Sequence, residues 1–146
     1  MLGMNNKQLS SSREDYLEVI LHIQKEKGRV RVREIAEKMN VSLPSVTGAL
    51  KILGGEGLVE YSPYDLVRLS ERGFKTAENI QQKHEILMDF FVNVLNADKD
   101  EAAKAACAME HALSPLLLKK MMIFLKNFHK GKINDKQTGK GNRSTN

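Results

Sequence analysis

Tryptophan is absent from this 146-residue chain, and cysteine (1), proline (3) and aromatic residues (5%) are scarce. A single cysteine cannot form a disulfide within the chain, which excludes a disulfide-stabilised scaffold and fits a reducing cytoplasm. No apolar run approaches the roughly 20 residues that a membrane-spanning helix needs, and the first residues lack the apolar stretch of a signal peptide. We therefore expect a cytoplasmic globular protein rather than a secreted, membrane-spanning or fibrous one.

The formal net charge of +5 is unevenly distributed along the chain. Residues 119–146 carry +7, residues 76–118 carry −4, and residues 28–75 carry +2. The basic character therefore belongs mostly to the C-terminal segment, and by itself it is weak support for nucleic-acid binding. The informative contrast is between a mildly basic middle and the acidic segment that follows it.

The first 40 residues are predicted to contain two helices. Ser12 and Asp15 form a capping-box pattern ahead of apolar residues at helical spacing, and Gly28 ends that segment. Arginine and valine then alternate over residues 29–32, which favours a short strand or an extended link. Residues 33–39 follow as a second, shorter helix.

A tight turn separates this short helix from a third helix. Ser42 is the expected N-cap of the third helix, Pro44 lies in its first turn, and the helix ends near Leu53. Two short helices joined in this way form a helix-turn-helix. Residues 58–61 and 66–69 then predict a β-hairpin, and a helix-turn-helix followed by a two-stranded wing predicts a winged helix.

The rest of the chain is predicted to be helical. Five positions at helical spacing line one face of a long helix: Ile80, His84, Leu87, Phe91 and Leu95. Residues 99–113 form another helix, and a last helix restarts after Ser114 and ends near Phe128. From residue 131 onward the sequence has almost nothing to bury, so we expect disorder there.

Six side chains are candidate ligands for one or two divalent cations. Cys107, Glu110 and His111 are spaced i, i+3 and i+4, so a helix turns a thiol, a carboxylate and an imidazole to one side. The fourth is His84, an imidazole in an otherwise apolar stripe. The last two are Asp15 and Glu18, two carboxylates spaced i, i+3 in the first helix.

Each of these residues also has a purely structural interpretation. Asp15 can cap its own helix, and Glu18 can pair with His22 one turn later. Cys107 can be a small buried apolar side chain, and the Glu110–His111 pair can hydrogen-bond internally or to a neighbouring helix. A cysteine hydrolase is poorly supported, because no oxyanion donors accompany the thiol.

The third helix and the wing carry the candidate DNA contacts. Short polar side chains and a proline in the helix suit base edges and phosphates, and two cations suit phosphates. These residues are Ser42, Pro44, Ser45, Thr47, Lys51 and Arg68. The alternative interpretation of any one of them is solvated polar surface, but the helix-turn-helix context favours the group as a DNA surface.

Four segments occur in an order and spacing that resemble a known family. They are SREDYLE (12–18), VSLPSVT (41–47), GLVEY (57–61) and CAMEHALS (107–114). Together they resemble the diphtheria-toxin-repressor and manganese-transport-regulator family of metal-dependent repressors, over roughly residues 10–128. The resemblance implies a mainly α fold of the short, two-domain type.

The resemblance implies two domains: a winged helix-turn-helix DNA-binding domain, which we place at residues 1–75, and a helical metal-binding and dimerisation domain at residues 76–130. Residues 131–146 are expected, from their composition, to be a disordered basic tail. In the manganese type, Asp15, Glu18, His84, Glu110 and His111 occupy ligand positions.

Two positions depart from the patterns of the family. Cys107 stands where the manganese type has glutamate and the iron type has cysteine, and a thiolate favours metals softer than Mn²⁺. We therefore favour Fe²⁺ over Mn²⁺. Gly48 stands where iron-type members place a longer polar side chain for base contact, so the chain does not predict which bases are read there.

The resulting prediction is a cytoplasmic, homodimeric repressor that binds a double-stranded DNA operator when Fe²⁺ or Mn²⁺ is bound, and that controls metal-ion homeostasis genes. It is not expected to be an enzyme or to contact a membrane. One alternative is a winged-helix regulator that responds to an organic ligand near His84. Another is a metal enzyme that uses Glu110 or His111 as an acid or base.

Overall fold

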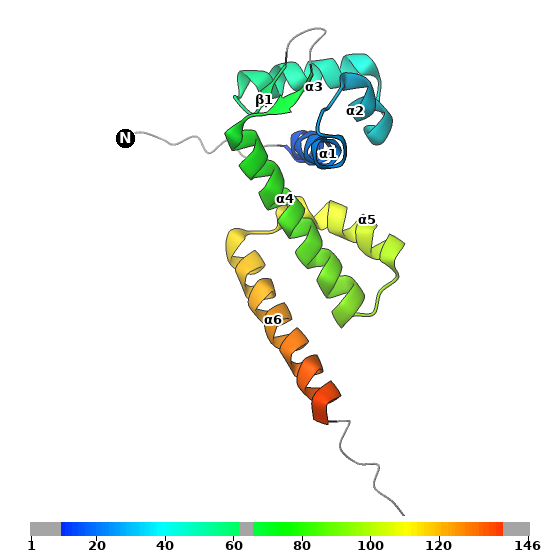
Figure 1. The fold of residues 1–146 in the computed structure, drawn as a ribbon, viewed down its shortest axis with the longest axis vertical. Coiled ribbons are helices and arrows are strands. Elements are labelled where there is room, and N and C mark those ends of the chain that lie inside the picture. Colours follow the sequence, from blue (N-terminus) through cyan, green and yellow to red (C-terminus); the bar gives the residue numbers. More distant parts are fainter. Residues whose placement is uncertain (1–9, 62–65, 139–146) are drawn as a thin grey trace, which may run out of the picture. The chain divides into compact units, whose positions relative to one another are not determined.

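The computed structural model describes residues 10–61 and 66–138, with side chains up to residue 133. The chain divides into two compact units, Met1–Gln82 and Lys83–Asn146. This division lies within a helix, seven residues after the boundary expected at residue 75. Figure 1 shows the helices and strands of both units in sequence colours.

The first unit contains three helices, a two-stranded sheet and the start of a fourth helix. These elements are α1 (Ser11–Lys27), α2 (Val32–Met39), α3 (Leu43–Gly55), β1 (Val59–Glu60), β2 (Arg68–Leu69) and α4 (Glu71–Asp89). A helix-turn-helix followed by paired strands is the predicted winged helix, and the mainly α fold class is confirmed.

Helix α1 begins two residues earlier than the capping pattern predicted. The N-cap is Ser10, whose hydroxyl accepts a hydrogen bond from the Arg13 N–H, rather than Ser12. Three consecutive serines offer equivalent caps, and sequence alone does not choose among them. At the other end Gly28 adopts the left-handed conformation (φ 75°), so the predicted C-terminus is confirmed.

The turn between α2 and α3 has the predicted chemistry. Asn40 is in the left-handed conformation, and the Ser42 hydroxyl caps α3 by accepting from the Ser45 N–H. Pro44 lies in the first turn, where its missing N–H costs no hydrogen bond. Helix α3 continues to Gly55, two residues beyond the predicted end.

The wing is an antiparallel sheet in which Val59 faces Leu69 and Glu60 faces Arg68. Its strands are shorter than predicted, and the turn at 62–65 lies outside the described residues. The strand expected at residues 29–32 is reduced to one antiparallel bridge between Val30 and Val67.

A continuous apolar core fills the first unit. It joins α1, α2, α3 and the sheet, and includes Leu17, Ile35 and Leu50, none of which is exposed. The first turn of α4 can lie against the backbone beside β1 because Gly73 has no side chain. A Cβ at this position would lie 1.9 Å from the Leu58 carbonyl oxygen. Any side chain at this position would force the two segments apart.

The second unit contains the end of α4 and four further helical segments. These are η1 (Phe90–Val94, a π-helix), α5 (Lys99–Met109), η2 (Glu110–Ala112, a 3₁₀ turn) and α6 (Pro115–Thr138). A small core of Leu87, Ala106 and Leu113 packs them together, with Phe91 and Met121 against it. Among the described residues, no helix is both long and apolar enough to cross a membrane.

Two predictions for this unit need correction. The π-helix widens the turn after Asp89, so Leu95 leaves the apolar stripe and is 58% exposed. Helix α6 ends at Thr138 rather than near Phe128, so residues 131–138 of the expected disordered tail are helical. Gly131 weakens a helix by only about 1 kcal/mol, which an established helix tolerates. Residues 139–146 lie outside the described residues.

Candidate metal centre and nucleic-acid interface

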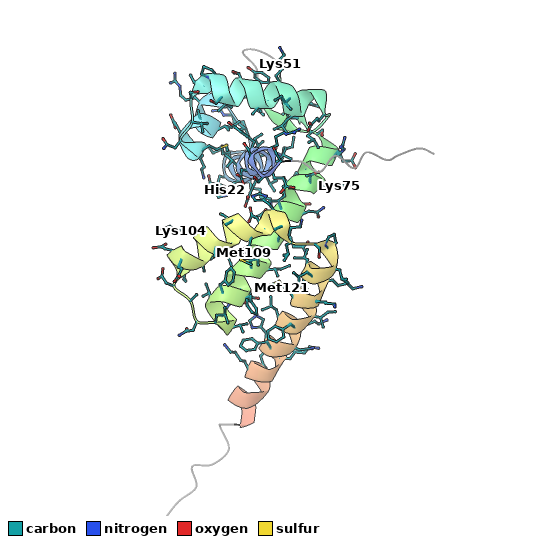
Figure 2. The ribbon with its side chains drawn as sticks, turned by 180° about the vertical axis from the view of Figure 1, so that it is seen from behind. His22, Lys51, Lys75, Lys104, Met109 and Met121 are labelled. Atoms are coloured by element: carbon teal, nitrogen blue, oxygen red, sulfur yellow. The ribbon has the colours of Figure 1, made fainter. Side chains whose placement is uncertain are left out.

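Three potential metal ligands converge in the second unit. His84 Nδ1 lies 2.7 Å from Glu110 Oε2 and 3.8 Å from Cys107 Sγ. One ligand atom from each of the three residues lies within 4.8 Å of the other two. They come from α4, the last turn of α5 and η2, and Figure 2 shows α5 crossing α4 near Met109.

Glu110 lies where helix α5 changes into the 3₁₀ turn η2. The prediction that Cys107, Glu110 and His111 share one α-helical face is wrong in detail, since α5 ends at Met109 and the chain tightens into a 3₁₀ turn. The Glu110 carboxylate is buried, with Oε2 toward His84 and Oε1 3.7 Å from His111 Nε2. It therefore contacts two imidazoles.

The donor set fits a divalent transition metal. Metal–ligand distances of about 2.0–2.3 Å place two ligands of one ion no more than about 4.6 Å apart. The His84–Glu110 and His84–Cys107 separations satisfy this limit. A thiol, an imidazole and a carboxylate together suit Fe²⁺ or a softer ion better than Ca²⁺ or Mg²⁺, which prefer oxygen ligands alone. The Cys107 side chain is exposed, so its structural interpretation as a small buried residue is wrong.

The two carboxylates of α1 belong to the first unit. Asp15 and Glu18 are both half-buried and lie one turn apart. Because Ser10 is the N-cap, Asp15 is not at the capping-box position that its structural interpretation required. The alternative pairing of Glu18 with His22 is also wrong, since His22 Nε2 lies 3.2 Å from Glu26 Oε1.

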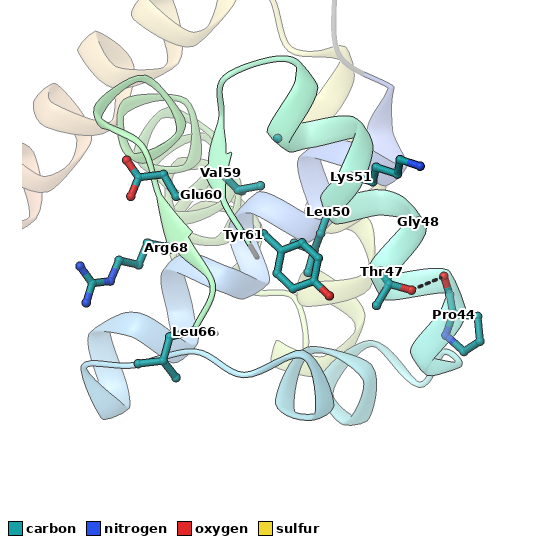
Figure 3. A pocket seen from close by; sticks show the side chains of 11 residues that line it. Pro44, Thr47, Gly48, Leu50, Lys51, Val59, Glu60, Tyr61, Leu66 and Arg68 are labelled. Carbon is teal, nitrogen blue, oxygen red and sulfur yellow. Dashed lines mark hydrogen bonds between the residues drawn. The ribbon is translucent and has the colours of Figure 1, made fainter. Parts of the chain in front are cut away.

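A groove of about 1240 Å³ lies between α3 and the wing of the first unit (Figure 3). Four of the predicted DNA contacts line it: Pro44, Thr47, Lys51 and Arg68. Lys51 and Arg68 are exposed, as phosphate contacts require. The groove therefore has a helix and a basic strand on opposite walls.

Ser42 and Thr47 also have structural roles. The hydroxyls of Ser42 and Ser45 lie 2.8 Å apart at the start of α3, where Ser42 is the cap. The Thr47 hydroxyl donates to the carbonyl oxygens of Leu43 and Pro44, and Figure 3 draws the hydrogen bond to Pro44. Both hydroxyls thus have partners within the protein.

Sequence reasoning missed part of the groove lining. Tyr61 and Leu66 line it from the wing, and Gly48 lines it from α3. A Cβ at Gly48 would meet no atom within 4 Å, so the glycine leaves the exposed face of α3 open there. No pattern in the sequence distinguishes Tyr61 or Leu66 from other hairpin residues.

Comparison with known families matches both units. The model of the iron dependent repressor N-terminal DNA binding domain covers residues 8–67. The model of the iron dependent repressor metal binding and dimerisation domain covers residues 70–137.

Individual relatives agree with this match. An uncharacterised HTH-type transcriptional regulator of Methanocaldococcus jannaschii is 38% identical over 121 residues, covering 82% of this chain and 97% of the relative. The transcriptional regulator MntR of Escherichia coli is 33% identical over 111 residues, covering 76% of this chain and 71% of MntR.

Solved structures give the same result. The manganese regulator SloR has a TM-score of 0.70 at 32% identity, covering 78% of this chain and 53% of SloR. A manganese-dependent transcriptional repressor in complex with manganese has a TM-score of 0.71 at 30% identity, covering 78% of this chain and 52% of that one. The chain thus spans about half the length of these solved proteins.

A winged helix-turn-helix with a thiol–imidazole–carboxylate cluster in the second unit defines the class of metal-responsive transcriptional regulators. The chain belongs to the iron-dependent repressor family, since the two family models match nearly its whole length. This is a family of transcriptional repressors that bind divalent metals and dimerise, not of enzymes. The prediction that the chain is not an enzyme is therefore confirmed, and the organic-ligand alternative is not favoured.

Proposed function

We propose that the chain is a homodimeric, cytoplasmic repressor that binds a double-stranded DNA operator when a divalent cation occupies its metal centre. The observation that carries the proposal is the convergence of His84, Cys107 and Glu110 in one unit of a chain whose other unit is a winged helix. By the resemblance, its targets are genes of metal-ion homeostasis.

The proposed ligands fall into a core, supported by distances in the structure, and further residues added on other grounds. The core is His84, Cys107 and Glu110, which the distances above support. His111 is added because its imidazole faces the second oxygen of the Glu110 carboxylate. Asp15 and Glu18 are added on the sequence resemblance, and both are half-buried carboxylates one turn apart on α1.

The proposed ion is Fe²⁺ rather than Mn²⁺. Cys107 supports this choice, because a thiolate raises affinity for softer ions, whereas Mn²⁺ prefers oxygen and imidazole ligands. SloR is named a manganese regulator, whereas both matching family models are named for iron dependent repressors. These names leave Fe²⁺ and Mn²⁺ both as candidates for this chain, and the chemistry of Cys107 favours Fe²⁺.

The proposed DNA surface is the groove between α3 and the wing, together with the exposed N-terminus of α3. Ser42, Pro44 and Ser45 supply the N-terminal contacts, and Thr47 lies one turn further along. Lys51 and Arg68 supply phosphate contacts from opposite walls of the groove. In a dimer, two such surfaces read half-sites about 34 Å apart along the duplex.

The proposed dimer contact uses the apolar side chains that α6 leaves exposed. Leu116, Leu117, Ile123 and Phe124 are each about half exposed or more. Contiguous exposed apolar groups of this kind mark an association surface. A second copy of the chain is the expected partner, because the matching family model is a dimerisation domain.

Metal acts in this proposal by selecting one conformation. A cation that binds the DNA-competent arrangement more tightly than other arrangements shifts the population toward it. The ligands themselves supply the coupling, since Asp15 and Glu18 lie on α1 and the other donors on α4, α5 and η2. Neutralising these carboxylates also reduces their repulsion of DNA phosphates.

The test is anaerobic capture of genomic DNA fragments by the purified protein with Fe²⁺, with Mn²⁺ or with chelator, followed by sequencing. We expect a shared palindrome to be recovered only when metal is present, with Fe²⁺ effective at the lower concentration. Equal recovery in chelator would reject metal control and leave a winged helix that binds DNA constitutively.

A further inference from the structure

A second basic surface lies next to the wing, outside the groove between α3 and the wing. Four cations and one acid line a hollow between the end of α1 and the start of α2: Lys27, Arg29, Arg31, Arg33 and Glu34. The three arginines are exposed. None of the roles described above uses them.

The acid that lines this hollow already accepts hydrogen bonds from the protein. Glu34 accepts hydrogen bonds from Lys27 Nζ (2.8 Å) and from the backbone N–H of Arg31 (3.0 Å). The hydrogen bond from Lys27 holds the pKa of the Glu34 carboxyl below its usual value, and the same contact raises the pKa of Lys27. Glu34 therefore stays ionised and bound to Lys27, and the arginines keep their positive charge toward solvent.

The register of the sheet places this surface beside the groove. Val30 bridges Val67 in an antiparallel pair, so one residue further along each segment Arg29 stands opposite Arg68. Directly opposite residues point to the same face of a sheet. The same register pairs Arg31 with Leu66, and both Leu66 and Arg68 line the groove. Figure 3 shows Leu66 and Arg68 on the wing side of the groove.

Burial along these segments agrees with this register. Val30, Val59 and Val67 are buried on the inner face of the sheet, whereas Arg29, Arg31 and Arg68 are exposed. The basic wall of the groove thus continues across the sheet to α2. On the other side of β2 Glu60 faces Arg68, so most of the positive charge of this continuous surface comes from the three arginines of the hollow.

We propose that Arg29, Arg31 and Arg33 bind the phosphate backbone of the DNA duplex beyond the wing, as a second contact surface continuous with the groove. This proposal rests on the proposed function and extends its DNA surface. Guanidinium groups bind phosphate in a bidentate manner, and phosphate contacts position a protein on DNA without reading its sequence. The surface is therefore expected to act on operator and non-operator DNA alike.

The test measures binding to a mixed-sequence DNA duplex over a range of salt concentrations, with Mn²⁺ present. In the double variant Arg29→Ala/Arg33→Ala, the slope of log affinity against log salt should become shallower by about 0.9 for each phosphate that the protein no longer binds, roughly two units in all. The affinity at low salt should fall by about tenfold or more. The variant Arg29→Lys/Arg33→Lys keeps both charges and should keep most of the salt slope.

The matched control is Lys75→Ala/Lys104→Ala, which removes two positive charges from exposed positions of α4 and α5 (Figure 2). Its salt slope should equal that of the unchanged protein. Equal slopes for the arginine variant and this control would overturn the second surface while leaving the proposed function intact. If the unchanged protein binds no duplex at any salt concentration, the proposed function fails and the second surface fails with it.

Discussion

Two histidine–carboxylate contacts of the second unit, His84–Glu110 and His129–Asp89, differ in what surrounds the carboxylate. His84 lies 2.7 Å from Glu110, and His129 Nε2 lies 2.9 and 3.0 Å from the two oxygens of Asp89. Around Glu110 the further groups are the Cys107 thiol and a second imidazole. All of them can donate electron pairs to a cation.

The surroundings of Asp89 are chemically different. Its carboxylate accepts a hydrogen bond from the Asn93 amide (2.7 Å), and the Lys132 ammonium donates to the carbonyl oxygen of Asn93. Amide N–H and ammonium groups offer hydrogen, not electron pairs, and the ammonium repels a cation. An imidazole beside a carboxylate is therefore part of a candidate metal centre at one position and a contact between α4 and α6 at the other.

The largest expected effect comes from removing the carboxylate of the first contact. Glu110→Ala should abolish metal-stimulated DNA binding and weaken metal affinity by about a hundredfold or more, because removing even a residue that only supports a ligand typically costs 10–100-fold. Metal titration by calorimetry and DNA binding with and without metal measure the two effects.

The matched control for this variant is Asp89→Ala, which removes the carboxylate of the second contact. Its metal affinity should match that of the unchanged protein. A similar loss of metal affinity in both variants would remove the distinction between the two contacts, and undiminished metal stimulation in Glu110→Ala would reject the proposed centre.

A smaller effect is expected from changing the type of donor at the first contact. Cys107→Glu replaces a soft ligand with a hard one, so the Fe²⁺/Mn²⁺ affinity ratio should shift toward Mn²⁺ on the order of tenfold, equivalent to about 1.4 kcal/mol. Competitive metal titrations under anaerobic conditions measure this ratio. An unchanged ratio would show that Cys107 does not determine the choice of metal.

The smallest expected effect is on the free energy of unfolding, to which the contact between His129 and Asp89 contributes. Burial opposes ionisation of Asp89, but hydrogen bonds from Asn93 and His129 outweigh it and hold the pKa of Asp89 below its usual value. A carboxyl with a lowered folded pKa stabilises the fold above its ordinary pKa, and this stabilisation is lost as pH falls through the lowered value. Asp89→Asn should reduce the free energy of unfolding by about 1 kcal/mol near neutral pH.

Urea unfolding at a series of pH values and one protein concentration tests this expectation. The difference between Asp89→Asn and the unchanged protein should shrink as the solution becomes acidic. A difference that stays constant down to low pH would show that the stabilisation does not depend on the charge of Asp89.

The winged helix was predictable because its signals are local. Gly28, Ser42 and Pro44 act through backbone conformation and hydrogen bonds within a few residues, and each has its predicted place. The start of α1 was not predictable, because the serines at positions 10–12 compete for the same cap. The end of α6 was missed because the cost of Gly131 is small once a helix is established.

The sequence indicated which residues form the candidate metal centre, but not the backbone conformation of the segment that carries them. An α-helical period was assumed for 107–111, whereas α5 ends at Met109 and residues 110–112 form the 3₁₀ turn η2. The π-helix after Asp89 likewise breaks the period of 3.6 that was assumed up to Leu95. Such local changes of helical period depend on tertiary packing, so the spacing of residues in the sequence does not reveal them.

Gly73 carries a consequence for genetics. Because a methyl group there would overlap the Leu58 carbonyl oxygen, Gly73→Ala strains the junction between the wing and α4 without touching any proposed ligand or DNA contact. A chromosomal allele with this change should be temperature-sensitive, with repression retained in cool cultures and lost in warm ones. Shifting such a strain between temperatures would switch the regulated genes on and off while the metal supply stays constant.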